Sequence, residues 1–215
     1  MAIFDKYLIV LSEMNKFYIT TFFLFFIFTN LNSQSFGVKI GLNSTNIRGG
    51  YDDENKSRES FHFGVLIEYK ITNEFSFQPE LIYSPQGHIY SWSEKETDTY
   101  KETFKLDYLN IPLIAKYYLT EGLSLEGGPQ IGFLLSAKGE MVSINEDGKD
   151  ISTYKLESVK NMTLGLNFGV GYLFDNGINF GARFNFDLNS IYKGNSDGDN
   201  VRKNNVLQFF VGYLF

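Results

Sequence analysis

The sequence of 215 residues contains no cysteine, only four prolines and only two histidines. Without cysteine the chain has no disulfide framework, no thiolate metal ligand, no cysteine nucleophile and no lipidated N-terminal cysteine. Two histidines leave little basis for a zinc or iron site. Basic residues are also in deficit, 19 against 25 acidic ones. A net charge of −6 argues against nucleic acid as the main partner, because phosphate binding requires a basic face.

Long hydrophobic runs are missing too, and the mean hydropathy is −0.16. The apolar stretch 17–28 falls short of the roughly 20 residues that a transmembrane helix needs. It follows Lys16 and precedes the polar segment 30–34, an arrangement typical of a secretory signal peptide. We expect cleavage near Ser33 or Gln34. A buried hydrophobic helix is the alternative.

The first thirteen residues suit a signal peptide poorly, because they contain the acidic residues Asp5 and Glu13. Met14 is therefore the expected functional start. We predict that residues 1–34 form the signal segment and that residues 35–215 form one domain, since no repeat, proline-rich linker or shift in composition divides them.

Aromatic residues make up 17% of the chain, and they recur at alternate positions. In residues 177–188 every even position is apolar, and every odd position is polar or glycine. Residues 161–172 repeat this pattern, and the Asp-Asn-Gly sequence at 175–177 predicts a tight hairpin between the two. A period of two predicts β-strands with each face in a different environment. Six further segments alternate less regularly, which brings the total to eight strands: 36–43, 61–70, 75–84, 104–119, 123–135 and 207–215.

The segment 104–119 changes parity along its length. Its apolar residues occupy even positions as far as Tyr108 and odd positions from Ile111 onward. We expect a β-bulge near Leu109 and Asn110, because one extra residue shifts the alternation.

The connections between the predicted strands alternate in length. Short connections are expected at 71–74, 120–122 and 175–177, and long polar ones at about 44–60, 85–103, 138–158 and 189–204. An even number of strands with alternating short turns and long loops is typical of outer-membrane barrels, in which both termini lie on the periplasmic side.

The size of the residues on each face distinguishes a membrane barrel from a soluble one. The polar faces are rich in glycine, as a narrow lumen requires, whereas the apolar faces carry aromatic and leucine side chains that would overfill an eight-stranded interior. Aromatic residues also gather at the predicted periplasmic strand ends, as an interfacial girdle would: Tyr69, Phe75, Tyr117, Tyr172, Phe174, Tyr213 and Phe215. We predict an all-β, eight-stranded antiparallel up-and-down transmembrane β-barrel. A soluble periplasmic ligand-binding barrel is the alternative.

Charged residues on the polar faces would then point into the lumen. We expect a structural network of salt bridges among six of them, because buried charges require partners: Lys39, Glu68, Glu80, Lys116, Glu126 and Arg183. Lys70 should also point inward, and Asp187 should lie nearer the outer end. A narrow ion or proton path is the alternative, whereas a general porin would need many more strands.

Three other groups of residues have side chains that could carry chemistry. Ser84 and His88, with Glu94 and Glu96 nearby, could serve an outer-membrane lipid hydrolase, although no motif fixes their geometry. His62 is the second imidazole. The segment 197–200 carries oxygen ligands suited to calcium but lacks the rest of a calcium loop, so a turn is favoured. We expect no catalytic residue, no metal and no cofactor.

Two segments carry a family resemblance. Residues 106–119 (LDYLNIPLIAKYYL) and 127–138 (GGPQIGFLLSAK) resemble the Bacteroidetes outer-membrane β-barrel family that includes PorT. The closing VLQFFVGYLF resembles the C-terminal signal that the barrel-insertion machinery reads, with the alternate residues Phe209, Val211, Tyr213 and Phe215. The resemblance covers about residues 35–215 and implies no catalytic residue.

The resemblance implies a place in the bacterial outer membrane, with outer-membrane lipid and the insertion machinery as partners. PorT itself is associated with type IX secretion. We therefore expect a non-catalytic structural or interaction protein, or an accessory of an envelope or secretion complex that is contacted through its outer loops. A lipid-modifying barrel enzyme is the alternative.

Overall fold

The computed structural model describes residues 34–49, 55–95, 98–145, 148–194 and 201–215. Its internal contacts divide the chain into two units, Met1–Gln34 and Ser35–Phe215. Apart from Gln34, the predicted signal segment lies outside the described residues. No helix in the described part of the chain has the length and apolar character needed to cross a membrane.

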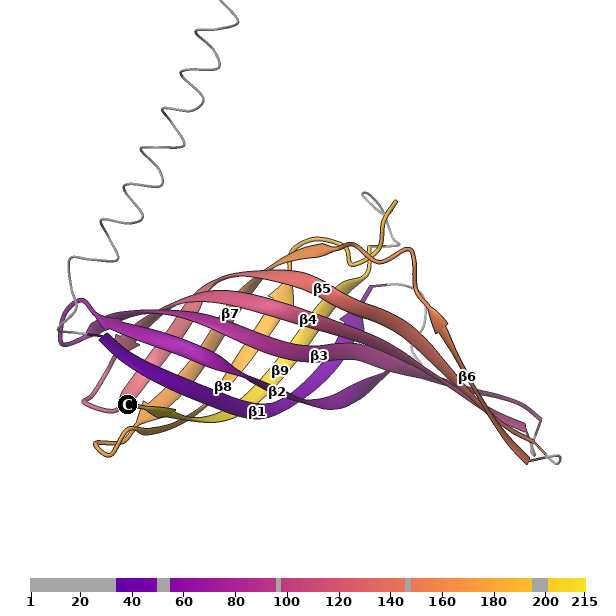
Figure 1. Cartoon of the computed structure of the whole chain (residues 1–215), viewed down its shortest axis with the longest axis horizontal. Helices are drawn as coiled ribbons and strands as arrows, with labels where there is room; N and C mark the ends of the chain where they lie inside the picture. The colour runs from indigo at the N-terminus through magenta and orange to yellow at the C-terminus, as the bar shows by residue number, and fades with distance from the viewer. Residues whose placement is uncertain (1–33, 50–54, 96–97, 146–147, 195–200) are drawn as a thin grey trace, which may run out of the picture. The chain divides into compact units, whose positions relative to one another are not determined.

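The second unit is built from antiparallel strands that close into a ring (Figure 1). The strands are β1 (Gln34–Arg48), β2 (Asn55–Lys70), β3 (Phe75–Lys95), β4 (Asp98–Tyr118), β5 (Leu123–Asn145), β6 (Gly148–Lys155), β7 (Met162–Leu173), β8 (Ile178–Asp187) and β9 (Lys203–Leu214). Their order is β4-β3-β2-β1-β9-β8-β7-β5-β6, and β4 also pairs with β5. Eight strands therefore form the predicted barrel, and β6 is an additional strand paired only with the far part of β5.

Side chains alternate between the two surfaces of the ring. On β8, Phe180 and Phe184 are exposed on the outside, at 49% and 43%, whereas Arg183 and Asn185 are buried inside. The same alternation holds on β1, where Ile40 is exposed and Lys39 is buried. The apolar faces thus point outward, which confirms the membrane-type orientation, whereas a soluble barrel would turn these faces inward.

Short turns join the strands at one end of the ring, which we call the short-turn end. They span residues 71–74, 119–122 and 174–177, within a residue of the prediction. In the last turn Gly177 has a φ of +86°, which favours glycine, and its N–H donates to the carbonyl oxygen of Phe174. Exposed aromatic side chains lie beside this turn, where Tyr172 and Phe174 make an edge-on contact at 5.0 Å between ring centroids.

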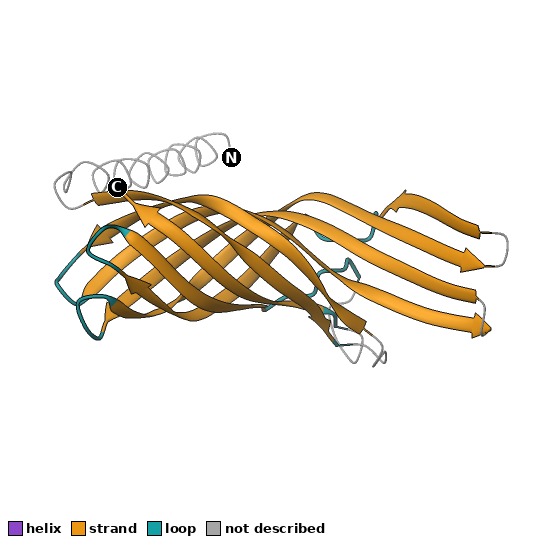
Figure 2. Ribbon diagram, turned by 90° about the horizontal axis from the view of Figure 1, so that it is seen from below, coloured by secondary structure: helices purple, strands orange, loops and turns teal. Residues whose placement is uncertain are grey.

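At the opposite end, which we call the hairpin end, the long loops are shorter than predicted. β3, β4 and β5 contain 21, 21 and 23 residues, whereas β8 contains 10. With β6 they form a sheet that extends well beyond the ring (Figures 1 and 2). The prediction failed because β6 is exposed on both faces and the extended parts of β3, β4 and β5 are mostly only half-buried, so their sequences carry no clear apolar alternation. A stacked pair of Trp92 and Tyr100 stabilises it across β3 and β4.

The predicted bulge in β4 is wrong in position. Even-numbered residues of β4 stay buried from Leu106 through Tyr108 and Asn110 onward, so the parity of this strand does not change. The register shift lies instead in β5, where Leu135 is the extra residue between the partners of Asp107 and Tyr108. The parity signal was misleading because apolar side chains occupy the interior at this level.

These apolar side chains form a small core at the hairpin end of the ring. Leu106 and Tyr108 pack there with residues from β1, β5 and the connecting segments: Ile47, Ala137, Val159 and Ile191. A single antiparallel β-bridge between Val159 and Tyr192 joins the two connecting segments. The apolar core covers the polar interior from this side.

Candidate functional site: the polar interior

The six charged residues singled out from the sequence lie together inside the ring. Each comes from a different strand, and all are buried: Lys39 from β1, Glu68 from β2, Glu80 from β3, Lys116 from β4, Glu126 from β5 and Arg183 from β8. Three cations and three carboxylates leave this network with no net formal charge. Alternation places them inside, because each stands on the polar parity of its strand.

Arg183 is the centre of the network. Its Nη1 lies 3.0 Å from Glu80 Oε2, and its Nη2 lies 3.0 Å from Glu80 Oε1. The same Nη2 also donates to Glu126 Oε2 at 2.6 Å. A planar guanidinium suits this two-carboxylate arrangement better than an ammonium group, because its donors are fixed in a fork.

Lys39 completes the environment of Glu80. Its Nζ donates to Glu80 Oε1 at 2.8 Å and lies 4.0 Å from the centroid of the Phe210 ring. Gln78 Nε2 donates to the same carboxylate oxygen at 2.5 Å. Glu80 therefore accepts hydrogen bonds from three side chains, which offsets the cost of removing its charge from water.

Lys116 links the remaining carboxylates. Its Nζ lies 3.1 Å from Glu68 Oε2 and 3.9 Å from Glu126 Oε1. The Tyr118 hydroxyl donates to Glu68 Oε1 at 2.6 Å. The network is thus continuous from β1 across the interior to β2, and a buried network of this kind is stable only while every member keeps its partners.

Sequence reasoning missed three members of this network. Gln78 and Tyr118 stand on the inner parity of their strands and could have been found by it. Phe210 is harder to find, because it is an apolar residue on an inner face of β9 that mixes polar and apolar side chains. Lys70 has the same parity as Glu68 but is exposed at the end of β2, so it is not part of the buried network. Asp187 is buried at the hairpin end of β8, as its position predicts.

Amide and hydroxyl side chains fill the middle of the interior. Asn43 is their hub, because its Nδ2 donates to Ser84 Oγ at 3.0 Å and its Oδ1 lies 2.7 Å from His62 Nδ1. Gln208 Nε2 also donates to Asn43 Oδ1, at 3.0 Å. From the short-turn end to the hairpin end, β1 therefore presents a charge at Lys39, an amide at Asn43 and an apolar group at Ile47.

The candidate hydrolase residues belong to this interior. Ser84 Oγ accepts hydrogen bonds from Asn43 and Gln86, and both Ser84 and His88 are buried. The His88 ring stacks on Phe104 at 4.3 Å between centroids. These side chains lie away from the lipid-facing surface, where a lipid hydrolase would need them.

Metal binding has no support in the described residues, among which no group of three or more His, Asp or Glu side chains is placed to hold an ion. The segment 197–200, with its oxygen ligands suited to calcium, lies outside them. The charged groups of the interior instead pair with one another.

The four alternate residues at the C-terminus lie on the outer face of β9 and at the residue that follows it. Phe209, Val211, Tyr213 and Phe215 are all exposed, and Phe215 is the most exposed at 75%. β9 pairs with β1 along its length, so the first and last strands of the barrel meet at this seam.

Comparison with known proteins decides the family. The family model described as "Outer membrane protein beta-barrel domain" matches residues 30–193, more than half of the chain. The chain belongs to this family. It is an outer-membrane β-barrel protein, and the exposed apolar belt is the surface that faces lipid. No curated protein matches the sequence significantly.

Several solved outer-membrane barrels are similar in fold. Ail, the attachment invasion locus protein of Yersinia pestis, is 13% identical, with a TM-score of 0.47, and the match covers 86% of this chain and 100% of Ail. Neisserial surface protein A is 14% identical, with the same TM-score and the same two coverages. CarO of Acinetobacter baumannii is 13% identical, with a TM-score of 0.41, and the match covers 81% of this chain and 97% of CarO.

Proposed function

We propose that this outer-membrane barrel is a non-catalytic interaction protein that engages a partner protein of the envelope through the sheet at its hairpin end. The observation that carries the proposal is the length of β3, β4 and β5. A membrane-spanning strand needs about 9–11 residues, yet these strands contain 21–23. In this barrel class the longer connections lie on the extracellular side, so the extra sheet faces outward from the cell.

The edge of this sheet offers a site for a partner strand. β6 ends the strand order, so among the described residues its far edge has no neighbouring strand. Leu156 N–H bonds to the Ala137 carbonyl. Because antiparallel ladders alternate, the N–H of Ile151 then points to the free edge. Exposed apolar side chains on and beside this edge, including Ile144 and Ile151, favour strand addition by a partner.

A photo-crosslinking amino acid at position 151 of the full chain in its native cells tests this proposal. We expect one discrete protein adduct at position 151. The matched position 168 carries Phe168, which is similarly exposed on the lipid-facing surface, and it should give lipid adducts only. Lipid adducts alone at both positions would contradict the proposal.

Ile151→Pro and Ile151→Ala separate the edge from the side chain. The Ile151 N–H donates to Asp150 Oδ1 at 2.9 Å, a bond that a partner strand would replace. Proline removes this N–H, which disfavours strand addition, while the position on an edge strand tolerates it. Because position 151 is now substituted, the crosslinking amino acid is placed at position 149. We expect the protein adduct to disappear with Ile151→Pro and to persist with Ile151→Ala. Equal adduct yields from the two variants would rule out strand addition at this edge.

The C-terminal residues are proposed as the contact for the barrel-insertion machinery. We expect Phe215→Ser to reduce the amount of folded barrel in the outer membrane several-fold, measured as the fraction that migrates faster on unheated SDS gels. Phe36→Ser is the matched control, because Phe36 is an exposed aromatic residue at the same end of the neighbouring strand. Similar losses in both variants would show that general lipid contact, and not a terminal signal, is responsible.

Three finer assignments belong to the same proposal. The protein is exported by the signal segment 1–34, it is related to the Bacteroidetes family that includes PorT, and it acts as an accessory of an envelope or secretion complex. The resemblance of residues 106–119 and 127–138 supports the relation to PorT. Loss of activity on phospholipid after Ser84→Ala or His88→Ala would favour the enzyme alternative instead.

A further inference from the structure

Three lysines stand side by side where the barrel wall meets the extended sheet. In the strand register Lys105 of β4 lies opposite Lys138 of β5, and Lys138 lies opposite Lys155 of β6. Directly opposed residues of antiparallel strands share one face, with Cβ atoms about 4.5–5.5 Å apart. Like charges in that position repel one another and destabilise a sheet. An anion bound to this lysine row (Lys105, Lys138 and Lys155) would relieve the repulsion.

Only part of the lysine row is neutralised within the chain. Lys105 Nζ lies 2.7 Å from Glu140 Oε2, and this hydrogen bond lowers the pKa of the Glu140 carboxyl. Among the described residues, Lys138 and Lys155 have no carboxylate within ion-pair distance, and both are exposed. The outer part of the row is therefore positively charged and open.

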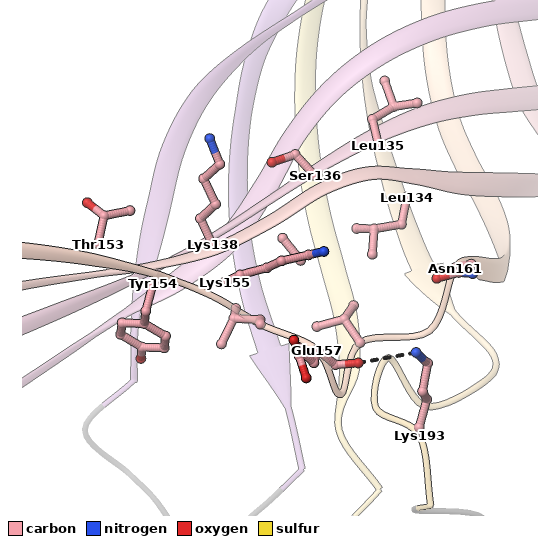
Figure 3. Close-up of a pocket in the computed structure, with 13 residues that line it drawn as sticks. Leu134, Leu135, Ser136, Lys138, Thr153, Tyr154, Lys155, Glu157, Asn161 and Lys193 are labelled. Carbon is pink, nitrogen blue, oxygen red and sulfur yellow. Dashed lines mark hydrogen bonds between the residues drawn. The ribbon is translucent and has the colours of Figure 1, made fainter.

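A cavity of about 780 Å³ lies beside the row (Figure 3). It forms because β5 changes neighbours: Leu156 N–H bonds to the Ala137 carbonyl, whereas Leu134 N–H bonds to the Asn161 carbonyl. The residues between Leu156 and Asn161 leave the wall and open a notch, whose size is in the range of small-molecule sites.

The lining of the notch is amphipathic. Lys138 and Lys155 border it, with Lys193, whose Nζ donates to the Glu157 carbonyl at 3.2 Å. Glu157 is the one acidic residue in the lining, against three lysines. On the lipid side the lining includes Leu135, which is 57% exposed and continues the apolar belt.

We propose that this notch binds the phosphate group of an outer-leaflet lipid, with Lys138 and Lys155 on the phosphate and the lipid chain against Leu135. The position supports this occupant. Along β5 the row begins three residues beyond Leu135, about 10 Å at the usual rise per residue, where the headgroups meet the apolar core. The site is separate from the free edge near Ile151 and does not depend on it.

Calorimetric titration of the full chain in uncharged detergent tests the site. The probes are dioctanoyl phosphatidic acid, dioctanoylglycerol, which lacks the phosphate, and inorganic phosphate. We expect wild type to bind phosphatidic acid about thirtyfold more tightly than dioctanoylglycerol, since each lysine near an anionic lipid contributes about fivefold. Inorganic phosphate should bind more weakly than phosphatidic acid, because it lacks the apolar contact.

Two double variants provide the comparison. Lys138→Gln with Lys155→Gln should abolish the preference for phosphatidic acid, whereas Lys101→Gln with Lys149→Gln should keep it. The second pair removes two exposed cations from the same sheet away from the notch. Folding of each variant is checked by migration on unheated SDS gels, and the first pair should be at least as stable as wild type because it removes like charges.

Equal affinity of the first pair and wild type for phosphatidic acid would overturn the proposal. Binding of inorganic phosphate as tight as that of phosphatidic acid would overturn the assignment to a lipid.

Discussion

Arg183→Met is expected to lower the free energy of unfolding by about 3–5 kcal/mol, because it leaves buried carboxylates without their partner. Arg183 makes three of the contacts that hold Glu80 and Glu126. Lys39 continues to neutralise Glu80, but the closest donor to Glu126 is lost. The measurement is urea unfolding in lipid vesicles, followed by the fraction that migrates as folded barrel on unheated SDS gels.

A second substitution separates loss of charge balance from loss of packing. Adding Glu126→Gln to Arg183→Met leaves two lysines and two carboxylates, with Lys39 on Glu80 and Lys116 on Glu68. We expect the double variant to be more stable than Arg183→Met alone. The surface control Lys101→Met should change stability by no more than about 0.5 kcal/mol. A double variant no more stable than the single one would contradict the ion-pair account.

Gly41→Ala is expected to destabilise the barrel by about 1–3 kcal/mol through overpacking. A Cβ atom at Gly41 would lie 2.5 Å from His62 Cε1 and 2.8 Å from His62 Nε2, and it would collide with the backbone oxygen of Phe209. That oxygen belongs to the β1–β9 seam, where Gly41 pairs with Phe210, so it cannot move without disturbing the ladder. The same urea titration measures the effect.

Gly127 supplies the matched control for this prediction. It is also a barrel glycine, but the nearest atom to an added Cβ is the Asn167 backbone oxygen at an ordinary 3.7 Å. Gly127→Ala should therefore change stability by no more than about 0.5 kcal/mol. Equal effects at the two positions would show that the interior near His62 has room that the structure does not indicate.

The ring of strands follows from the sequence because its two surfaces differ in chemistry. Residues 177–188 alternate without exception, since each side chain of β8 faces either lipid or the crowded interior. The same parity groups the six charged residues on the inner face. It does not say which pairs meet: Arg183 and Glu80 are 103 residues apart in sequence, and the tilt and stagger of the strands determine their contact.

Three features could not be predicted from the sequence pattern: β6, the parity of β4 and the lysine row. Residues 148–155 form β6, but every one of them is exposed, so no apolar face marks the strand. Leu106 and Tyr108 are apolar yet point inward, so their positions were wrongly assigned to the outer face of β4. The lysine row depends on register across three strands, and register could not be read from any one of them.

Nitroxide scanning along β8 tests the central claim most directly, and the absence of native cysteine makes it simple, because each introduced cysteine is the sole labelling site. Labels are placed in turn at the outward positions of Phe180 and Phe184 and at the inward positions of Asn179 and Asn185 in the membrane-embedded protein. We predict high collision rates with oxygen, which concentrates in lipid, at positions 180 and 184, and low rates at 179 and 185. High rates at 179 and 185 instead would mean that the polar face meets lipid, and the account would be wrong.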